Sequence, residues 1–294
     1  GDVYKRQPLF YFLGTLIAEV FSLPPEKPLV IIGFFTFIFI GLGVFGYVFE
    51  LTRSLTAGFL ASILVVSSYS VWDWMIFGGV YPRIFGLSLS VFSFWLLARF
   101  LQTLKKTSSF PRWNFLGLVI VLTASIISHV LMGFFACVFI FLNLVFFPLP
   151  WREKIKYGML IYLTSFCLAS FFLLPLVFSF GGESFHFLGL SQPLAPAPFF
   201  FLFGFDGMGP FVLSLLGVSL MIVILKWLKL APFGKKFSLK PTFAPFIMLL
   251  YFSFYALIGY TGLSGKYYYI GGFIPVSATL FMTCLLYTSP SPRD

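Results

Sequence analysis

P-L-V-I-I-G-F-F-T-F-I-F-I-G-L-G-V-F-G-Y-V-F-E-L, residues 28–51, is one continuous apolar run with no charged side chain before Glu50. Runs of about 18 or more apolar residues are typical of helices that cross the hydrocarbon core of a bilayer. The run shows no sustained alternation of apolar and polar residues, which a half-buried strand would require. Residues 28–51 therefore predict a transmembrane helix.

The rest of the chain repeats this pattern. Only 10% of the 294 residues are charged, whereas about 25% is usual in a soluble domain. Because lipid accepts only helices or closed barrels, the predicted fold class is all-α, a polytopic transmembrane helix bundle. Stretch 114–148 is too long for one span, so we expect it to divide near 129–133. The other apolar stretches are 9–23, 55–72, 84–101, 158–180, 211–225, 243–262 and 270 onward. Together they predict about nine spans and a short first helix, interfacial or truncated.

Lysine and arginine indicate the orientation of these spans, because cytoplasmic loops of membrane proteins carry an excess of both residues. They concentrate in the connections 105–112, 152–156 and 226–240. If these connections are cytoplasmic, the order of spans places Arg53 on the same side. Apart from the two chain ends, it leaves only Lys27, Arg83 and Lys266 outside. The basic balance is thus explained by topology, and nucleic-acid binding is not expected.

The two chain ends differ from the rest of the sequence. D-V-Y-K-R-Q, residues 2–7, and C-L-L-Y-T-S, residues 284–289, can be encoded by one DNA sequence read on opposite strands. That sequence resembles a transposase recognition end used to fragment DNA for sequencing, and P-S-P-R-D matches the adapter beyond it. We therefore expect residues 1–7 and 284–294 to be translated adapter, and residues 8–283 to be one truncated transmembrane domain.

Candidate functional residues gather on the predicted outer side, where both histidines also lie. Asp73 and Arg83 flank D-W-M-I-F-G-G-V-Y-P-R, residues 73–83, which joins two spans. Pro82 suits the first turn of the following helix. Arg83 in that turn opposes the helix dipole, so an anion such as a lipid phosphate or Asp73 is an expected partner. An interfacial anchoring charge is the alternative, and the sequence favours neither of the two.

The remaining candidates each have a plainer structural reading. His129, in S-I-I-S-H-V-L-M-G, is expected at an outer turn, where hydrogen bonding between helices competes with a catalytic role. Glu183 and His186 stand three residues apart in the long outer loop 181–210, and Asp206 there fits a turn. Lys266, beside three tyrosines, fits either a phosphate site or an interfacial anchor. Cys137 and Cys167 lie in apolar helices as small hydrophobes, and no metal-binding cluster is present in the sequence.

Three segments carry a resemblance to a known family. P-L-F-Y-F-L-G, residues 8–14, is similar to the Pro-Pro-Leu-Tyr-Tyr stretch that follows the first outer loop of GT-C type membrane glycosyltransferases. Residues 78–100, from G-G-V-Y-P-R to L-A-R-F, and I-I-S-H-V-L-M-G, residues 126–133, resemble prokaryotic membrane proteins called 6-pyruvoyl-tetrahydropterin-synthase-related. The members of that family look GT-C-like, and the likeness spreads over most of residues 8–283.

The resemblance implies an inverting transferase at the extracytoplasmic face of a prokaryotic inner membrane, using a polyprenyl-phosphate-linked sugar. It implies Asp73 as the second-loop acid, and Arg83 and Lys266 as ligands of the donor phosphate. A first-loop acid, as base or ligand of a divalent cation, would precede Pro8, so we expect this fragment to be inactive alone. The alternatives are a transporter or lipid flippase, for which mid-membrane charges are expected, and a non-catalytic assembly protein.

Overall fold

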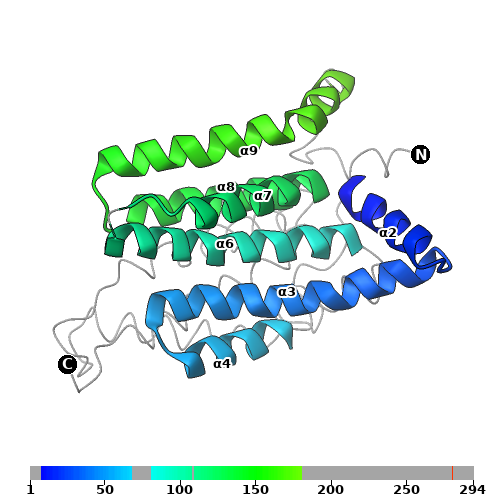
Figure 1. Ribbon diagram of the computed structural model, residues 1–294, viewed down its shortest axis with the longest axis horizontal. Coiled ribbons are helices and arrows are strands. Elements are labelled where there is room, and N and C mark those ends of the chain that lie inside the picture. The colour runs from blue at the N-terminus through cyan, green and yellow to red at the C-terminus, as the bar shows by residue number, and fades with distance from the viewer. Residues whose placement is uncertain (1–7, 68–80, 108, 181–279, 281–294) are drawn as a thin grey trace, which may run out of the picture.

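The computed structural model describes residues 8–67, 81–107, 109–180 and 280, and these form helices without any strand. Figure 1 shows the helices lying side by side as a bundle, with a short helix across one end. The helices are α2 (Pro8–Val20), α3 (Glu26–Thr52), α4 (Leu55–Val66), α6 (Tyr81–Thr107), α7 (Arg112–Ser128), α8 (Val130–Phe146) and α9 (Trp151–Phe180). The prediction of an all-α fold is thus confirmed for the described residues.

Helix α3 contains the apolar run of residues 28–51. It ends where Arg53 adopts a left-handed conformation, with φ of 58°, and donates its backbone N–H to the Phe49 carbonyl. The Arg53 guanidinium also lies 2.8 Å from the Glu50 carboxylate. Ser54 then caps α4 by accepting a hydrogen bond from the Ala57 N–H. The chain therefore reverses direction within a few residues.

Glycines allow α3 and α6 to pack closely. A Cβ on Gly43 would lie 2.9 Å from the backbone of Val91 and Phe92, which means that the two helix backbones almost touch. Small residues at such contacts are typical of helix pairs in membranes. Phe39 of α3 contacts Phe92 edge to face, with 5.7 Å between the ring centroids. Gly46, one turn after Gly43, faces Trp95, one turn after Val91 and Phe92, so α3 and α6 run parallel.

Helices α6, α7 and α8 form the buried centre with α3. Phe94 of α6 stacks on Phe139 of α8, with ring centroids 3.9 Å apart. On α3, the Tyr47 hydroxyl donates a hydrogen bond of 2.7 Å to Oδ1 of Asn143. Tyr47 is fully buried, so this bond fixes α3 against α8 where few polar partners exist.

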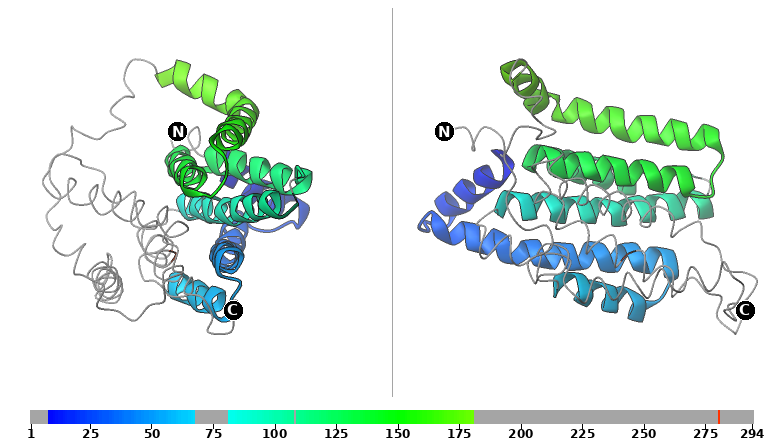
Figure 2. Two further views of the ribbon diagram at one scale, coloured as in Figure 1. Left: turned by 90° about the vertical axis from the view of Figure 1, so that its left-hand side faces the viewer. Right: turned by 180° about the vertical axis from the view of Figure 1, so that it is seen from behind.

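The directions of the helices bring the basic connections to one end of the bundle, on the left in Figure 1. We call this the basic end; it carries Arg53, Lys105, Lys106, Arg112 and Lys154. The opposite end carries α2 and the first turn of α6, and we call it the Arg83 end. Figure 2 shows the same arrangement from behind and along the bundle. The two ends therefore differ in charge, as predicted for the two sides of a membrane.

Three helices are long and apolar enough to cross a membrane: Glu26–Thr52, Tyr81–Thr107 and Trp151–Pro175. Shorter apolar helices cover Leu9–Val20, Leu55–Val66, Arg112–Ser128 and Met132–Phe146. The predicted division of 114–148 occurs at His129. The spans predicted at 211–225, 243–262 and from 270 onward lie outside the described residues, so nine spans stay a prediction.

Candidate functional site

Arg83 lies in the first turn of α6, which begins at Tyr81 and includes Pro82. Only 3% of its surface is exposed. Burial of a guanidinium in an apolar bundle costs free energy, and the positive end of the helix dipole adds to that cost. Arg83 is thus the kind of charge that a functional site explains better than a solvated surface does.

His129 forms the junction between α7 and α8. Its backbone is extended, with φ of −160° and ψ of 106°, so it ends one helix and begins the next. Its N–H donates to the Ser125 carbonyl at 3.0 Å, and its own carbonyl accepts from the Gly133 N–H at 3.0 Å. One residue thus connects two helices that pack against each other.

Gly86 brings His129 to the same face of α6 as Arg83. A Cβ on Gly86 would lie 2.9 Å from the His129 Cβ and 3.2 Å from the Met132 Cβ. Residues three apart on a helix share a face, so Arg83 lies one turn before this contact. Glycine at this position therefore allows the histidine to approach the arginine.

The imidazole of His129 is neutral at physiological pH. Only 8% of the residue is exposed. Burial, reinforced by the charge of Arg83, lowers the pKa of His129 from 6.5 to about 4, although its own backbone acts in the opposite direction. The site thus combines one cation with one neutral hydrogen-bonding ring.

Buried serines hold the helices around this pair. The hydroxyls of Ser90 on α6 and Ser125 on α7 lie 2.8 Å apart, so one of them donates to the other, and the Gly86 carbonyl oxygen lies 2.9 Å from the first and 3.2 Å from the second. Ser90 also lies 3.2 Å from the Met132 carbonyl of α8. These serines make the interhelical bonds that were expected of His129, whose Nδ1 is buried without a hydrogen-bond partner in the described part of the chain.

Aromatic rings from α2 cover the beginning of α6. Phe10 is 1% exposed and stacks on Tyr81, with ring centroids 6.2 Å apart. Its centroid also lies 5.7 Å from that of Phe85. The short first helix is therefore packed against the Arg83 end of the bundle.

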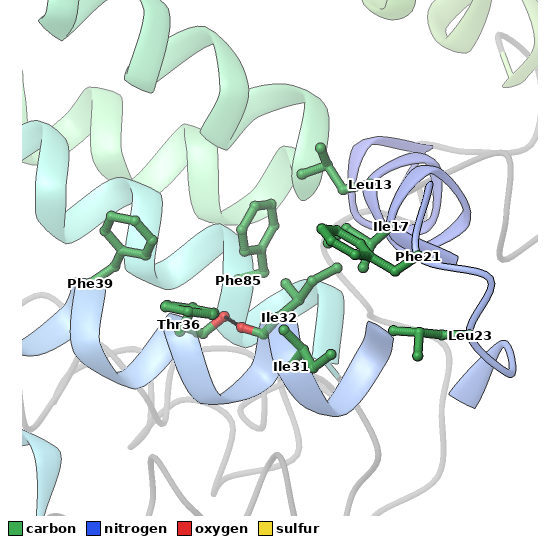
Figure 3. A pocket seen from close by; sticks show the side chains of 10 residues that line it. Leu13, Ile17, Phe21, Leu23, Ile31, Ile32, Thr36, Phe39 and Phe85 are labelled. Atoms are coloured by element: carbon green, nitrogen blue, oxygen red, sulfur yellow. Dashed lines mark hydrogen bonds between the residues drawn. The ribbon is translucent and has the colours of Figure 1, made fainter. Parts of the chain in front are cut away.

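An apolar groove of about 670 Å³ opens between α2, α3 and α6. Figure 3 shows Leu13 and Ile17 of α2 and Phe21 of the following turn facing Ile32 of α3, with Phe85 beside them. Thr36, the one hydroxyl in the lining, donates its proton to the Ile32 carbonyl at 2.8 Å. The groove thus offers no free polar donor and suits hydrocarbon.

The structure brings together two of the residues predicted from the sequence, Arg83 and His129. The other candidates, Asp73, Glu183, His186, Asp206 and Lys266, lie outside the described residues. Within the described ranges, no group of three or more His, Cys, Asp or Glu side chains is placed to hold a metal ion. Sequence analysis missed the groove and the serine contacts, although small residues at positions 86, 90 and 125 were a visible signal.

The described fold and site define a class of protein: a helical bundle with helices able to cross a membrane and with a buried cation at one end. Comparison with protein-family models, curated proteins and solved structures gives no match to this chain. The family resemblance therefore stays an expectation.

Proposed function

We propose that this chain belongs to a multi-pass, glycosyltransferase-like protein of a prokaryotic inner membrane. It binds a sugar linked to polyprenyl phosphate at the extracytoplasmic face and holds the phosphate while the sugar is transferred. The observation that carries the proposal is the buried Arg83 beside a neutral His129, within a turn of an apolar groove.

The charge of the site supports an anionic ligand. A guanidinium offers forked donors that match phosphate geometry. The serines around Arg83 donate to backbone carbonyls, so they compete little for such an anion. A phosphate held here would remain in reach of the outer membrane surface.

The groove supports a lipid-linked ligand. Phe85 lines it and stands two positions from Arg83 on α6, on a different face of the helix. A hydrocarbon chain in the groove would lie beside the first two turns of α6, and its headgroup would have to pass around the helix start to reach Arg83. Burial of a CH₂ group contributes about 0.8 kcal/mol when the group leaves water. A lipid chain already lies in hydrocarbon, so a groove that opens to lipid discriminates between chains mainly by their shape.

The catalytic roles follow from the family expectation. Asp73 would act as the second-loop acid, and Lys266 would share the donor phosphate with Arg83. A divalent cation is compatible with this scheme, held by carboxylates that the described residues do not include. In transfer, the acceptor hydroxyl gives its proton to the first-loop carboxylate that the resemblance implies as base. Its oxygen bonds to the anomeric carbon while the bond to the phosphate oxygen breaks, and Arg83 stabilises the departing phosphate anion.

A transporter or flippase is the competing function, and a non-catalytic assembly protein is a third. Among the buried side chains of the described helices there is no carboxylate, and the buried polar groups are hydroxyls besides Arg83 and His129. An ion-coupled pathway usually places ionisable groups near the membrane midplane. This composition favours a site at one end of the bundle over a pathway through it.

Lipid binding to the chain in nanodiscs of phosphatidylcholine tests the proposal. Native mass spectrometry would compare a hexosyl polyprenyl phosphate with the uncharged polyprenol. We expect the phosphate form to bind more tightly, and Arg83→Gln to weaken it by about 10- to 100-fold, which corresponds to a lost charged hydrogen bond.

Arg53→Gln is the matched control, because Arg53 pairs with Glu50 at the basic end and leaves the proposed site intact. Arg83→Lys keeps the positive charge at this position. It therefore shows whether a loss of binding in Arg83→Gln comes from the lost charge or from a folding defect. Equal binding of polyprenol and phosphate, or unchanged affinity in a folded Arg83→Gln variant, contradicts the proposal.

A further inference from the structure

The Nδ1 atom of His129 is a buried polar group without a hydrogen bond among the residues described. Buried polar atoms are nearly always paired, and those that are not often lie at functional sites. His129 is also the N-cap residue of α8 but makes no side-chain cap bond. The ring is therefore held in place by packing while its hydrogen-bonding capacity is left for another group.

The neighbouring hydroxyls do not supply a proton to this nitrogen. Ser128 donates to the Ala124 carbonyl at 2.6 Å, within its own helix. Ser125, one turn earlier, lies 3.2 Å from the Gly86 carbonyl and 2.8 Å from the Ser90 hydroxyl. Both serines adjoin the histidine in α7, yet both act in helix packing.

The charges of Arg83 and His129 restrict the chemical groups that a ligand of this site can carry. Arg83 is a permanent cation, and His129 next to it is a neutral ring. A second negative group beside His129 would gain little from a neutral ring, whereas a hydroxyl can form one good hydrogen bond with it. The arrangement fits a ligand that carries a hydroxyl close to its anionic group.

We propose that Arg83 and His129 bind the two parts of one ligand: Arg83 holds the phosphate, and His129 Nδ1 hydrogen-bonds a hydroxyl of the attached sugar. This inference rests on the proposed function and deepens it, since it assigns to His129 the recognition of the sugar-loaded carrier. Gly86 is the residue that permits the arrangement, because a side chain there would push the His129 Cβ away.

The test compares two lipids of equal charge. One is a hexosyl polyprenyl phosphate, and the other is a methyl polyprenyl phosphate, which keeps the phosphodiester and lacks the sugar. Their affinities for the whole 294-residue chain in phosphatidylcholine nanodiscs give a preference ratio. We expect a ratio of about 10 or more, because the methyl lipid leaves the buried nitrogen unpaired.

His129→Leu should abolish this ratio, because it lowers the affinity for the sugar-bearing lipid more than the affinity for the methyl lipid. His129→Gln, which keeps hydrogen-bonding groups, should retain part of the preference and shows that the fold survives substitution. Ser128→Ala is the matched control, since its hydroxyl is used within α7; it should keep the full ratio.

Two results would overturn the inference while leaving the proposed function intact. One is an equal affinity of the unchanged protein for both phospholipids. The other is a His129→Leu variant that weakens both lipids by the same factor, which would place the ring against the phosphate or in the packing alone. If neither phospholipid binds better than uncharged polyprenol, the proposed function itself fails.

Discussion

Replacing Gly133 by alanine tests the close contact between α7 and α8 that positions His129. A Cβ at this position would lie 2.6 Å from the Ile126 Cα and 2.9 Å from the Ile126 nitrogen. Carbon atoms prefer separations of about 3.5–4.0 Å, so the two backbones would have to part by roughly 1 Å. The contact is backbone, which no side-chain rotation can relieve.

The expected cost is about 1–3 kcal/mol, as for other overpacked sites. Gly117→Ala is the matched control in the partner helix: its Cβ would meet only Leu96, at 3.7 Å, which is ordinary contact. Alanine is favoured over glycine in a helix interior by about 0.8–1 kcal/mol, so this variant should be stabilised. Gly133→Ala should therefore lower the free energy of unfolding and Gly117→Ala should raise it. The free energies of unfolding of the two variants should differ by about 2–4 kcal/mol.

Thermal unfolding in detergent, followed by circular dichroism or a thiol-reactive dye, measures the difference. We expect the apparent Tm of Gly133→Ala to lie below that of Gly117→Ala by roughly 5 °C or more. The Gly133→Ala variant should also lose preference for the sugar-bearing lipid, because His129 moves with α8. Equal Tm values for the two variants would refute the close approach of α7 and α8.

Three further perturbations test other parts of the structure. Lowering the pH from 6.5 to about 4 should reduce the free energy of unfolding by an amount on the order of 3 kcal/mol. In this range His129 binds a proton in the unfolded chain, whereas in the folded protein its lower pKa keeps it neutral. Above pH 6.5 the contribution of His129 to stability is constant. Denaturant titrations should show that the free energy of unfolding of His129→Gln does not fall in this way between pH 6.5 and 4. The same fall in that variant would contradict the assignment of the effect to His129. Tyr47→Phe removes the hydrogen bond to Asn143 and should cost about 0.5–2 kcal/mol in the same titrations, whereas an unchanged midpoint would show that the bond adds nothing. Cysteines placed at Glu26 and Ser109, with the native cysteines replaced, should be labelled from opposite sides of the membrane in intact cells; labelling of both from one side would disprove the topology.

The sequence predicted the helices well where hydropathy alone decides them. Stretch 28–51 corresponds to α3, and the excess length of 114–148 correctly indicated a break. The apolar stretches that begin at 84 and 158 cover only part of their helices, since α6 begins at Tyr81 and α9 at Trp151, and the prediction that Pro82 lies in the first turn of its helix is confirmed. Hydropathy marks only the apolar part of a helix, whereas the backbone hydrogen bonds continue through polar turns such as Arg152–Lys156.

The candidate site was predictable only in part. A cation beside an apolar run identifies Arg83, since such charges are rare. The approach of His129 to Arg83 depends on tertiary packing across Gly86, which no local pattern states. The groove likewise depends on how α2 crosses α3, and a 13-residue apolar helix does not fix that angle by itself.

The one-residue junction at His129 also bears on how the protein is made. Between α7 and α8 there is no hydrophilic loop for the insertion machinery to carry across the bilayer. The two helices are each 17 residues long, at the lower limit for a span, so we predict that they would insert into a bilayer together as a hairpin. A neutral imidazole at the tip of the hairpin lowers the free-energy cost of insertion relative to a protonated imidazole. The same buried, neutral residue that lies near Arg83 in the folded protein would therefore also ease insertion of the hairpin.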